Sequence, residues 1–148
     1  MKLKLTNPAS CDIFRAMSYH SLEEAKSLLS NAGRVQQEWK KTLIKDRIQI
    51  VEKAMDYFRE NADTIARDIT MQMGKPINQS RNEVKGMIQR AEVICGFAED
   101  SLQDLSPSKQ EGLQRFIRRE PLGVVLDIVA WNYPLLIAVN VVVLAVLS

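Results

Sequence analysis

The stretch that decides the fold is RREPLGVVLDIVAWNYPL, residues 118–135. Residues 123–129 form a short run rich in β-branched side chains, which predicts a buried strand of a parallel sheet. The residues before the run, Pro-Leu-Gly at 121–123, are typical of a turn. Pro134 lacks the N–H group that a first helical residue leaves unpaired, so it can begin a helix. The stretch therefore predicts a turn, a strand and the start of a helix.

The chain after this stretch is apolar at every position of 135–147 except Asn140. A helix of this length spans about 20 Å, whereas the hydrocarbon core of a bilayer is roughly 30 Å thick. Extending the segment backwards brings in the polar residues Asn132 and Asp127. We therefore expect a buried helix and no membrane partner, and a membrane-attached helical protein is the alternative interpretation.

Upstream, residues 21–106 are predicted to be helical. Ser21 and Glu24 have the spacing of a capping box, which begins a helix. Further on, apolar residues recur at steps of four and three, which predicts one unbroken helix face. Its members are Ile44, Ile48, Val51, Met55, Phe58, Ala62, Ile65 and Ile69.

The sequence Gly-Lys-Pro at 74–76 interrupts this face, because glycine ends helices and proline begins them. Ser80 and Glu83 are a second candidate capping box for the next helix. The residues on the inner face of that helix are Val84, Met87, Ile88, Ala91, Ile94, Cys95, Ala98 and Leu102. Ser-Pro-Ser at 106–108 is predicted to end it.

Two further segments are not helical in pattern. Residues 1–20 are predicted to be irregular, with a turn at 7–10 and a possible short strand at Leu3 and Leu5. Residues 113–120 place Phe116 and Ile117 among arginines, which predicts a half-exposed strand.

The composition excludes several classes of protein. Apolar residues make up 46% of the 148 residues and charged residues 26%, which excludes a disordered chain. A net charge of +2 without a basic stripe indicates no nucleic-acid partner. Cys11 and Cys95 form neither a disulfide framework nor a metal cluster, and residues 1–8 lack the apolar core of a signal peptide. We expect a protein of the reduced cytoplasm without a metal.

Residues 118–125 and 127–135 together resemble a strand and a Pro-Trp-Asn-Phe-Pro segment of the NAD(P)-dependent aldehyde dehydrogenases. Asn-Pro-Ala at 7–9 and Met-Gly-Lys-Pro at 73–76 are similar to upstream elements of that family in order and spacing. The resemblance implies an incomplete α/β fold. Its parts would be an N-terminal segment at 1–20, a helical layer at 21–106, a bridging strand for oligomerisation at 107–121, and the first strand–helix unit of a Rossmann-like cofactor domain at 122–148.

The same resemblance implies the functional residues. Members of the family oxidise an aldehyde to a carboxylic acid through a cysteine nucleophile, a glutamate base and a hydride transfer to NAD or NADP. Asn132 would be catalytic, since its side-chain amide would donate to the oxyanion of the tetrahedral intermediate. The cofactor would be bound by residues of one short segment and by Asn132 itself. The residues of that segment are Ile128, Val129, Ala130 and Trp131.

The chain also departs from the family pattern. Ala130 replaces a proline, Tyr133 replaces a phenylalanine, and the later lysine, glycine turn, cysteine and glutamate have no counterpart. The resemblance covers the first third of a family member, so we expect the chain alone to be inactive and a complete form to be a homo-oligomer. A non-catalytic form that associates with full-length subunits is the alternative. The strand at 123–129 also has no parallel neighbour to satisfy its ladder groups.

Four other residues receive structural interpretations. Cys95 lies on an apolar helix face and is predicted to be a core residue. Cys11 matches no motif, and His20 is predicted to lie at the surface beside the start of a helix. Lys75 is interpreted as part of a helix boundary, because the full phosphate-binding GxxxxGK[ST] pattern is absent.

Overall fold

The computed structural model describes residues 2–108 and 111–148. Strands β1 (Lys2–Thr6) and β2 (Ile13–Ser18) form an antiparallel hairpin, with Leu3 opposite Met17. Five helices follow in the described part of the chain: α1 (Leu22–Trp39), α2 (Ile44–Glu60), α3 (Ala62–Met73), α4 (Ile77–Leu102) and α5 (Pro134–Leu147). The short strand expected at Leu3 and Leu5 is confirmed, and its partner β2 lies where irregular chain was predicted.

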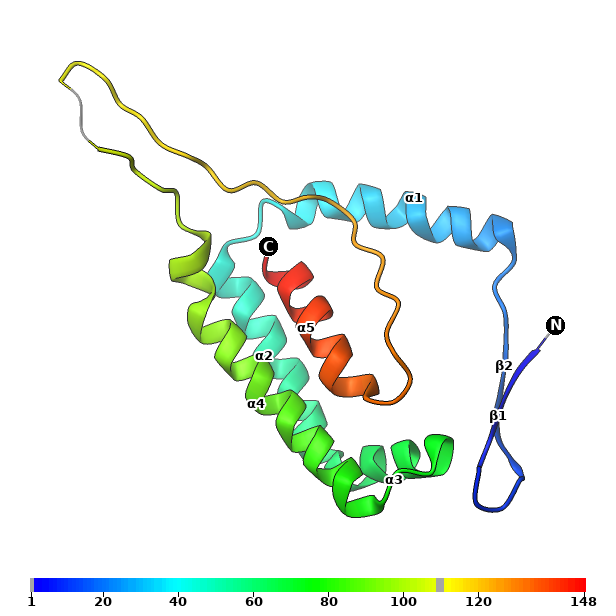
Figure 1. Ribbon diagram of the computed structural model, residues 1–148. Coiled ribbons are helices and arrows are strands. Elements are labelled where there is room, and N and C mark those ends of the chain that lie inside the picture. Colours follow the sequence, from blue (N-terminus) through cyan, green and yellow to red (C-terminus); the bar gives the residue numbers. More distant parts are fainter. Residues whose placement is uncertain (1, 109–110) are drawn as a thin grey trace.

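The core lies among α2, α3, α4 and α5. Figure 1 shows α5 alongside both α2 and α4, and side chains from all four helices make up one buried cluster. Its members are Val51, Met55, Ala66, Ile69, Val84, Met87, Ile88, Ala91, Cys95, Ala98, Val139, Val143 and Leu147. The predicted inner faces of the helices are thus largely confirmed. By contrast, α1 has no buried residue.

The apolar face at 44–69 was predicted to be one helix, and this is wrong. The helix ends at Asn61, whose φ of −107° and ψ of 14° are not helical, and α3 begins at the next residue. The Asn61 side-chain amide donates to the Tyr57 carbonyl at 2.8 Å, which stabilises the end of α2. Each helix still buries its own apolar residues in the common core, so the spacing indicated the buried face correctly and missed the turn.

The two strands predicted after residue 112 are not formed. Residues 113–120 form no strand, although Ile117 makes an isolated antiparallel bridge with Leu105, and residues 123–129 pair with no other strand among the described residues. Leu126 is 84% exposed and Ile128 is 85% exposed, so the predicted burial is wrong as well. A strand needs a neighbour for its N–H and C=O groups, and the described chain supplies none here. Residues 109 and 110, which fall in the predicted bridging segment, lie outside the described residues.

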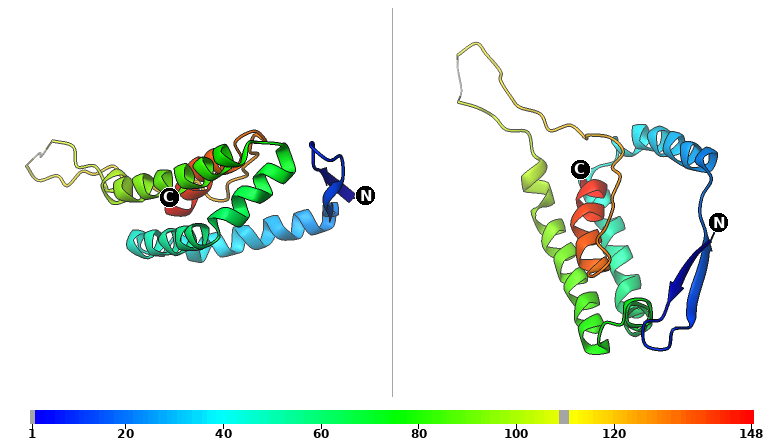
Figure 2. Two further views of the ribbon diagram at one scale, coloured as in Figure 1. Left: turned by 90° about the horizontal axis from the view of Figure 1, so that it is seen from below. Right: turned by 45° about the vertical axis from the view of Figure 1, so that its right-hand side comes forward.

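The chain between α4 and α5 runs beside the helical core. Helix α4 ends at Leu102, before the predicted stop at 106–108. Figures 1 and 2 show the described parts of 103–121 as extended arms that leave the helices and return to them. The chain then crosses near α1 and reaches Pro134, which begins α5 as predicted. This path brings the stretch 128–133 to the start of α5.

Candidate functional site

The residues predicted to act on substrate or cofactor lie together on one exposed segment. Ile128 and Trp131 are 85% and 76% exposed, Val129 is half-buried, and Ala130 and Asn132 are exposed. Asn132 stands in a turn directly before α5. Within the described part of the chain its side-chain amide makes no hydrogen bond, so its N–H groups are free to bind a ligand.

A buried ion pair lies beneath this turn. Lys75 donates to Oε2 of Glu83, and the two side chains are 7% and 0% exposed. The Lys75 ammonium also donates to the backbone carbonyl of Asn132 at 3.1 Å and lies 3.6 Å from the centre of the Tyr133 ring. The pair therefore connects α4 to the backbone of the residue predicted to be catalytic.

Glu83 also binds the first turn of α5. Its Oε1 accepts hydrogen bonds from the backbone N–H groups of Leu135 at 3.0 Å and Leu136 at 3.5 Å. These belong to the N–H groups that a helix leaves unpaired at its N-terminus, where the helix dipole also favours a negative charge. Glu83 thus does for α5 what a capping side chain does, although it comes from another helix.

The local sequence explains how the pair is placed, and the structure corrects one prediction made from it. Gly74 adopts φ +74° and ends α3, and Pro76 stands at the N-terminal cap of α4, which leaves Lys75 in the connection between them. Helix α4 begins at Ile77, so the predicted capping box at Ser80 and Glu83 is wrong: both residues lie within the helix and are buried.

A sequence signal for this pair did exist. Glu83 stands four residues before Met87 and eight before Ala91, which places a carboxylate on the apolar face of α4. A charge on such a face needs a partner, because a buried unpaired carboxylate is costly. Lys75, interpreted only as part of a helix boundary, is that partner.

The other end of α5 is held by a cation. Arg47, which is 6% exposed, donates to the carbonyls of Leu147 at 3.0 Å, Trp39 at 3.2 Å and Thr42 at 3.1 Å. The Trp39 indole N–H donates to the Val146 carbonyl at 3.0 Å. Buried charges of opposite sign therefore stand at the two ends of α5, each at the end that the helix dipole favours.

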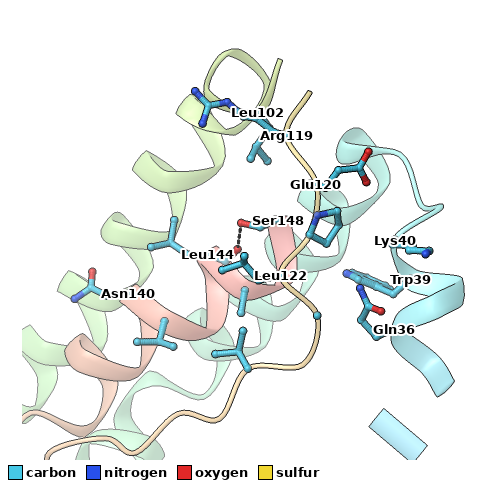
Figure 3. Close-up of a pocket in the computed structure, with 15 residues that line it drawn as sticks. Gln36, Trp39, Lys40, Leu102, Arg119, Glu120, Leu122, Asn140, Leu144 and Ser148 are labelled. Carbon is cyan, nitrogen blue, oxygen red and sulfur yellow. Dashed lines mark hydrogen bonds between the residues drawn. The ribbon is translucent and has the colours of Figure 1, made fainter. Parts of the chain in front are cut away.

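A cavity of about 550 Å³ lies between α1, residues 119–125 and α5. Figure 3 shows Trp39 on the side of α1 and Leu144 on the side of α5. Most of the side chains in this cavity are apolar, and none of the predicted site residues lines it. The cavity and the exposed segment at 128–132 are thus separate features.

Neither cysteine is placed to act as a nucleophile beside Asn132. Cys95 is buried in the core on α4, and burial raises the pKa of its thiol, with a further increase from the carboxylate of Glu52. Cys11 is exposed in the turn of the hairpin, and no described contact links it to the Asn132 turn. His20 is exposed, with Nδ1 3.9 Å from a carboxylate oxygen of Glu24. The core position of Cys95 and the surface position of His20 are confirmed.

The described residues offer neither a metal-binding cluster nor a membrane-spanning helix. Across residues 2–108 and 111–148, no cluster of three or more His, Cys, Asp and Glu side chains is arranged to hold a metal ion. In the same part of the chain, no helix combines the length and the apolar character needed to cross a membrane.

The whole chain, residues 1–148, matches the model of the aldehyde dehydrogenase family. It is 28% identical over 135 residues to the acylating mitochondrial methylmalonate-semialdehyde dehydrogenase of Arabidopsis thaliana, covering 91% of this chain and 22% of that protein. It is 27% identical to the NADP(+)-dependent succinate-semialdehyde dehydrogenase GabD of Escherichia coli, covering 89% of this chain and 27% of that protein. The chain therefore spans about a quarter of the length of these curated relatives.

Solved structures agree over almost the whole chain. Glyceraldehyde-3-phosphate dehydrogenase GapN of Methanocaldococcus jannaschii, complexed with NADP, superposes with a TM-score of 0.91 at 26% identity, covering 98% of this chain and 31% of that one. Betaine aldehyde dehydrogenase of Staphylococcus aureus, in complex with NAD+, gives a TM-score of 0.91 at 25% identity, covering 99% of this chain and 30% of that one.

Proposed function

This chain belongs to the aldehyde dehydrogenase family, and from that premise we propose that it supplies an oxyanion-binding group and part of a cofactor site for the oxidation of an aldehyde to a carboxylic acid. Asn132 is the oxyanion donor. Residues 128–131 bind NAD or NADP. The reaction takes place in a reduced, cytoplasmic setting and in a homo-oligomer.

The observation that carries this proposal is the state of Asn132. Its side-chain amide is exposed and unoccupied by any described hydrogen bond, while its backbone is held by Lys75 at the start of α5. A donor that binds a developing oxyanion needs free N–H groups and a fixed position, because reorganisation during the reaction would cost transition-state stabilisation. Asn132 combines both properties.

The residues at 128–131 fit a nicotinamide cofactor in part. Ile128 and Trp131 present apolar surface, and the unpaired backbone of this segment offers N–H and C=O groups beside it. None of these residues is charged, so the phosphates of the cofactor require groups outside this segment. When bound, NAD or NADP accepts the hydride of the aldehyde.

The 148 residues alone are expected to have no aldehyde dehydrogenase activity. The buried Cys95 thiol has a raised pKa, and Cys11 lies in the hairpin, so no described residue supplies the thiolate nucleophile. The test measures aldehyde-dependent reduction of NAD and NADP by the chain alone and by the complete product of its gene. Turnover by the chain alone would overturn this part of the proposal.

Asn132→Ala in the complete product is expected to lower kcat by about 10²- to 10³-fold, the usual cost of removing one oxyanion donor. The KM for the aldehyde should change much less, because the contact forms mainly in the transition state. Asn132→Asp should be at least as impaired, since a carboxylate repels the oxyanion. The exposed Asn82→Ala on α4 is the control. An unchanged kcat in a folded Asn132→Ala variant contradicts the proposed role.

A second candidate function is association with longer family subunits. The stretch before the site leaves apolar side chains in water, with Leu122 fully exposed and Leu126 at 84%, and Oδ2 of Asp127 is buried without a hydrogen-bond partner in the described structure. An exposed apolar segment with unpaired backbone is suited to pairing with a strand of another chain. Co-purification with a longer family member supports this function, and a monodisperse monomer in the presence of that member contradicts it.

A further inference from the structure

We infer that Lys75 and Glu83 are positioning residues that hold the Asn132 turn in the conformation needed for oxyanion binding. The inference rests on the proposed function of Asn132. Neither residue reaches the exposed face of the turn, because both side chains are almost completely buried. Their effect on the reaction must therefore pass through the backbone of residues 132–136.

The packing of α5 does not by itself order this turn. The buried residues of α5 are Val139, Val143 and Leu147, all beyond its first turn. Residues 134–138 are only half-buried, and 128–132 are mostly exposed. Leu135 and Leu136 also pack against the core at the start of α5, so the contacts of Glu83 add to that packing, whereas the backbone of the Asn132 turn is held by Lys75.

Glu83 fixes the direction of α5. One carboxylate oxygen accepts from the N–H groups of Leu135 and Leu136, and the other accepts from Lys75. A side chain that uses both oxygens in this way has little freedom to rotate. Because Glu83 lies within α4, the beginning of α5 is held at a set position against that helix.

Lys75 fixes the backbone of Asn132 and balances the local charge. Its ammonium donates to the Asn132 carbonyl and lies against the Tyr133 ring, so it contacts two consecutive residues of the turn. It also neutralises the Glu83 carboxylate, which would otherwise place a negative charge beneath a site that must stabilise an oxyanion. With the backbone held, only the two side-chain torsions of Asn132 remain to aim its amide.

Stability alone is a weak explanation for this pair. Removing two charges from water is costly, and well-packed apolar residues often replace a buried ion pair without loss. An apolar pair, however, cannot accept from the N–H groups of α5 or donate to the Asn132 carbonyl. The contacts of the pair with the Asn132 carbonyl and with the N–H groups of Leu135 and Leu136 therefore indicate positioning.

The first experiment is a double-mutant cycle in the complete product of the gene. Lys75→Met is expected to lower kcat by about tenfold to a hundredfold, the scale of a displaced catalytic group, with a smaller change in KM. In the Asn132→Ala background the same substitution should have almost no further effect, because it acts through Asn132. Effects that multiply in the double variant would mean a general structural role and would overturn the inference. Lys85→Met, exposed on α4, is the matched control.

A second variant separates the loss of the Lys75 hydrogen bond from misfolding caused by an unpaired buried charge. Lys75→Met leaves the Glu83 carboxylate without its cation, so the neutral pair Lys75→Met with Glu83→Gln is also made. This double variant keeps an oxygen acceptor for Leu135 and should fold like the wild type. Its kcat should stay low because the hydrogen bond to the Asn132 carbonyl is still missing. Recovery of wild-type kcat in this variant would overturn the positioning role of Lys75.

The second experiment tests the hydrogen bonds at the start of α5 without measuring enzyme activity. Amide hydrogen exchange of the 148-residue chain is followed by NMR for Leu135 and Leu136, with Glu83→Ala against the exposed control Glu99→Ala. Exchange should rise about tenfold or more in Glu83→Ala alone, and unchanged exchange overturns the inference. If exchange rises but Asn132→Ala leaves kcat unchanged, the contact is real and the proposed function of Asn132 fails instead.

Discussion

Gly74, Lys75 and Pro76 occupy three consecutive positions and have three different physical roles. Gly74 ends α3 in the left-handed region at φ +74°, and a Cβ there would lie 2.8 Å from Cγ of Pro8 in the hairpin turn. Pro76 has the φ of −54° that suits the start of α4. Lys75 is buried and connects Glu83 to Asn132. The first and third roles depend on local backbone geometry and were predicted, whereas the second depends on residues far along the chain.

The two cysteines are expected to differ in reactivity. Cys11 is exposed, whereas Cys95 is buried with a raised thiol pKa, which lowers its thiolate fraction at any pH below that value. A disulfide reagent should modify Cys11 at least about tenfold faster than Cys95 in the native chain. Mass spectrometry of the Cys11→Ser and Cys95→Ser variants measures each rate. Equal native rates would contradict the burial of Cys95, and denaturant should make the two rates similar.

At the scale of elements, the same capping-box spacing predicted one helix start correctly and another wrongly. The predicted capping box at the start of α1 is present. The Ser21 N–H donates to Oε2 of Glu24 at 2.6 Å, and the Glu24 N–H donates to Oγ of Ser21 at 3.2 Å. The similar spacing of Ser80 and Glu83 is not a box, because α4 had already begun at Ile77. The two cases have the same residue spacing, and only the position of the helix start separates them.

The start of α1 should weaken in acid. The pKa of Glu24 is lowered, chiefly by the backbone N–H of Ser21 and then by the Ser21 side chain. A lowered pKa means that the capping contribution is present above the ordinary glutamate range and is lost as the pH falls through the lower folded value. Carbon chemical shifts of residues 22–25 should therefore lose helical character on acidification.

The control for this titration is Glu23→Gln, since Glu23 pairs with Lys26 on the exposed surface of the same first turn. Glu23→Gln should leave the acid transition in place. Glu24→Gln should remove most of it, because glutamine does not titrate. A transition that persists unchanged in Glu24→Gln would show that another group controls the start of α1.

At the scale of the whole molecule, the described core is centred on α4, which contacts α2, α3 and the last helix of the chain, α5. Helix α5 packs on α4 and α2 (Figure 2), and buried charges hold its two ends, Glu83 at the N-terminus and Arg47 at the C-terminus. The hairpin contacts α3, and α1 buries no residue. The molecule therefore consists of a helical core with peripheral segments that contribute little burial.

The burial of α5 predicts which of its leucines stabilise the chain. Leu147 is 2% exposed and Leu144 is 51% exposed on the same helix. Leu147→Ala should lower the free energy of unfolding by about 2–5 kcal/mol, the usual range for a buried leucine. Leu144→Ala should cost less than about 1 kcal/mol, because its side chain already contacts water. Urea denaturation of both variants measures the difference, and equal losses would contradict this packing of α5.

The family resemblance and the incomplete fold of that family are confirmed, although the two strands predicted after residue 112 are not formed, and NAD or NADP is confirmed as the cofactor of neighbouring structures in the family. Asn132 was predicted as a site residue from its motif, but the Lys75–Glu83 pair beneath it was not predicted. The motif is contiguous, so it can be found by reading along the chain. Lys75 contacts both Glu83 and the Asn132 carbonyl, and these residues come together only when α5 packs against α4.

The sequence by itself determined the features that depend on neighbouring residues: the capped start of α1, the left-handed end of α3, the proline at the start of α5 and the apolar faces of the helices. Tertiary structure alone decided three others: the break between α2 and α3, the unpaired state of residues 123–129, and the attachment of the Asn132 turn to α4. The physical reason is that a strand ladder or a buried charge is stabilised by partners distant in sequence, which local periodicity does not identify. At the break between α2 and α3, the apolar steps of four and three continue through Asn61, so the same periodicity does not locate the turn.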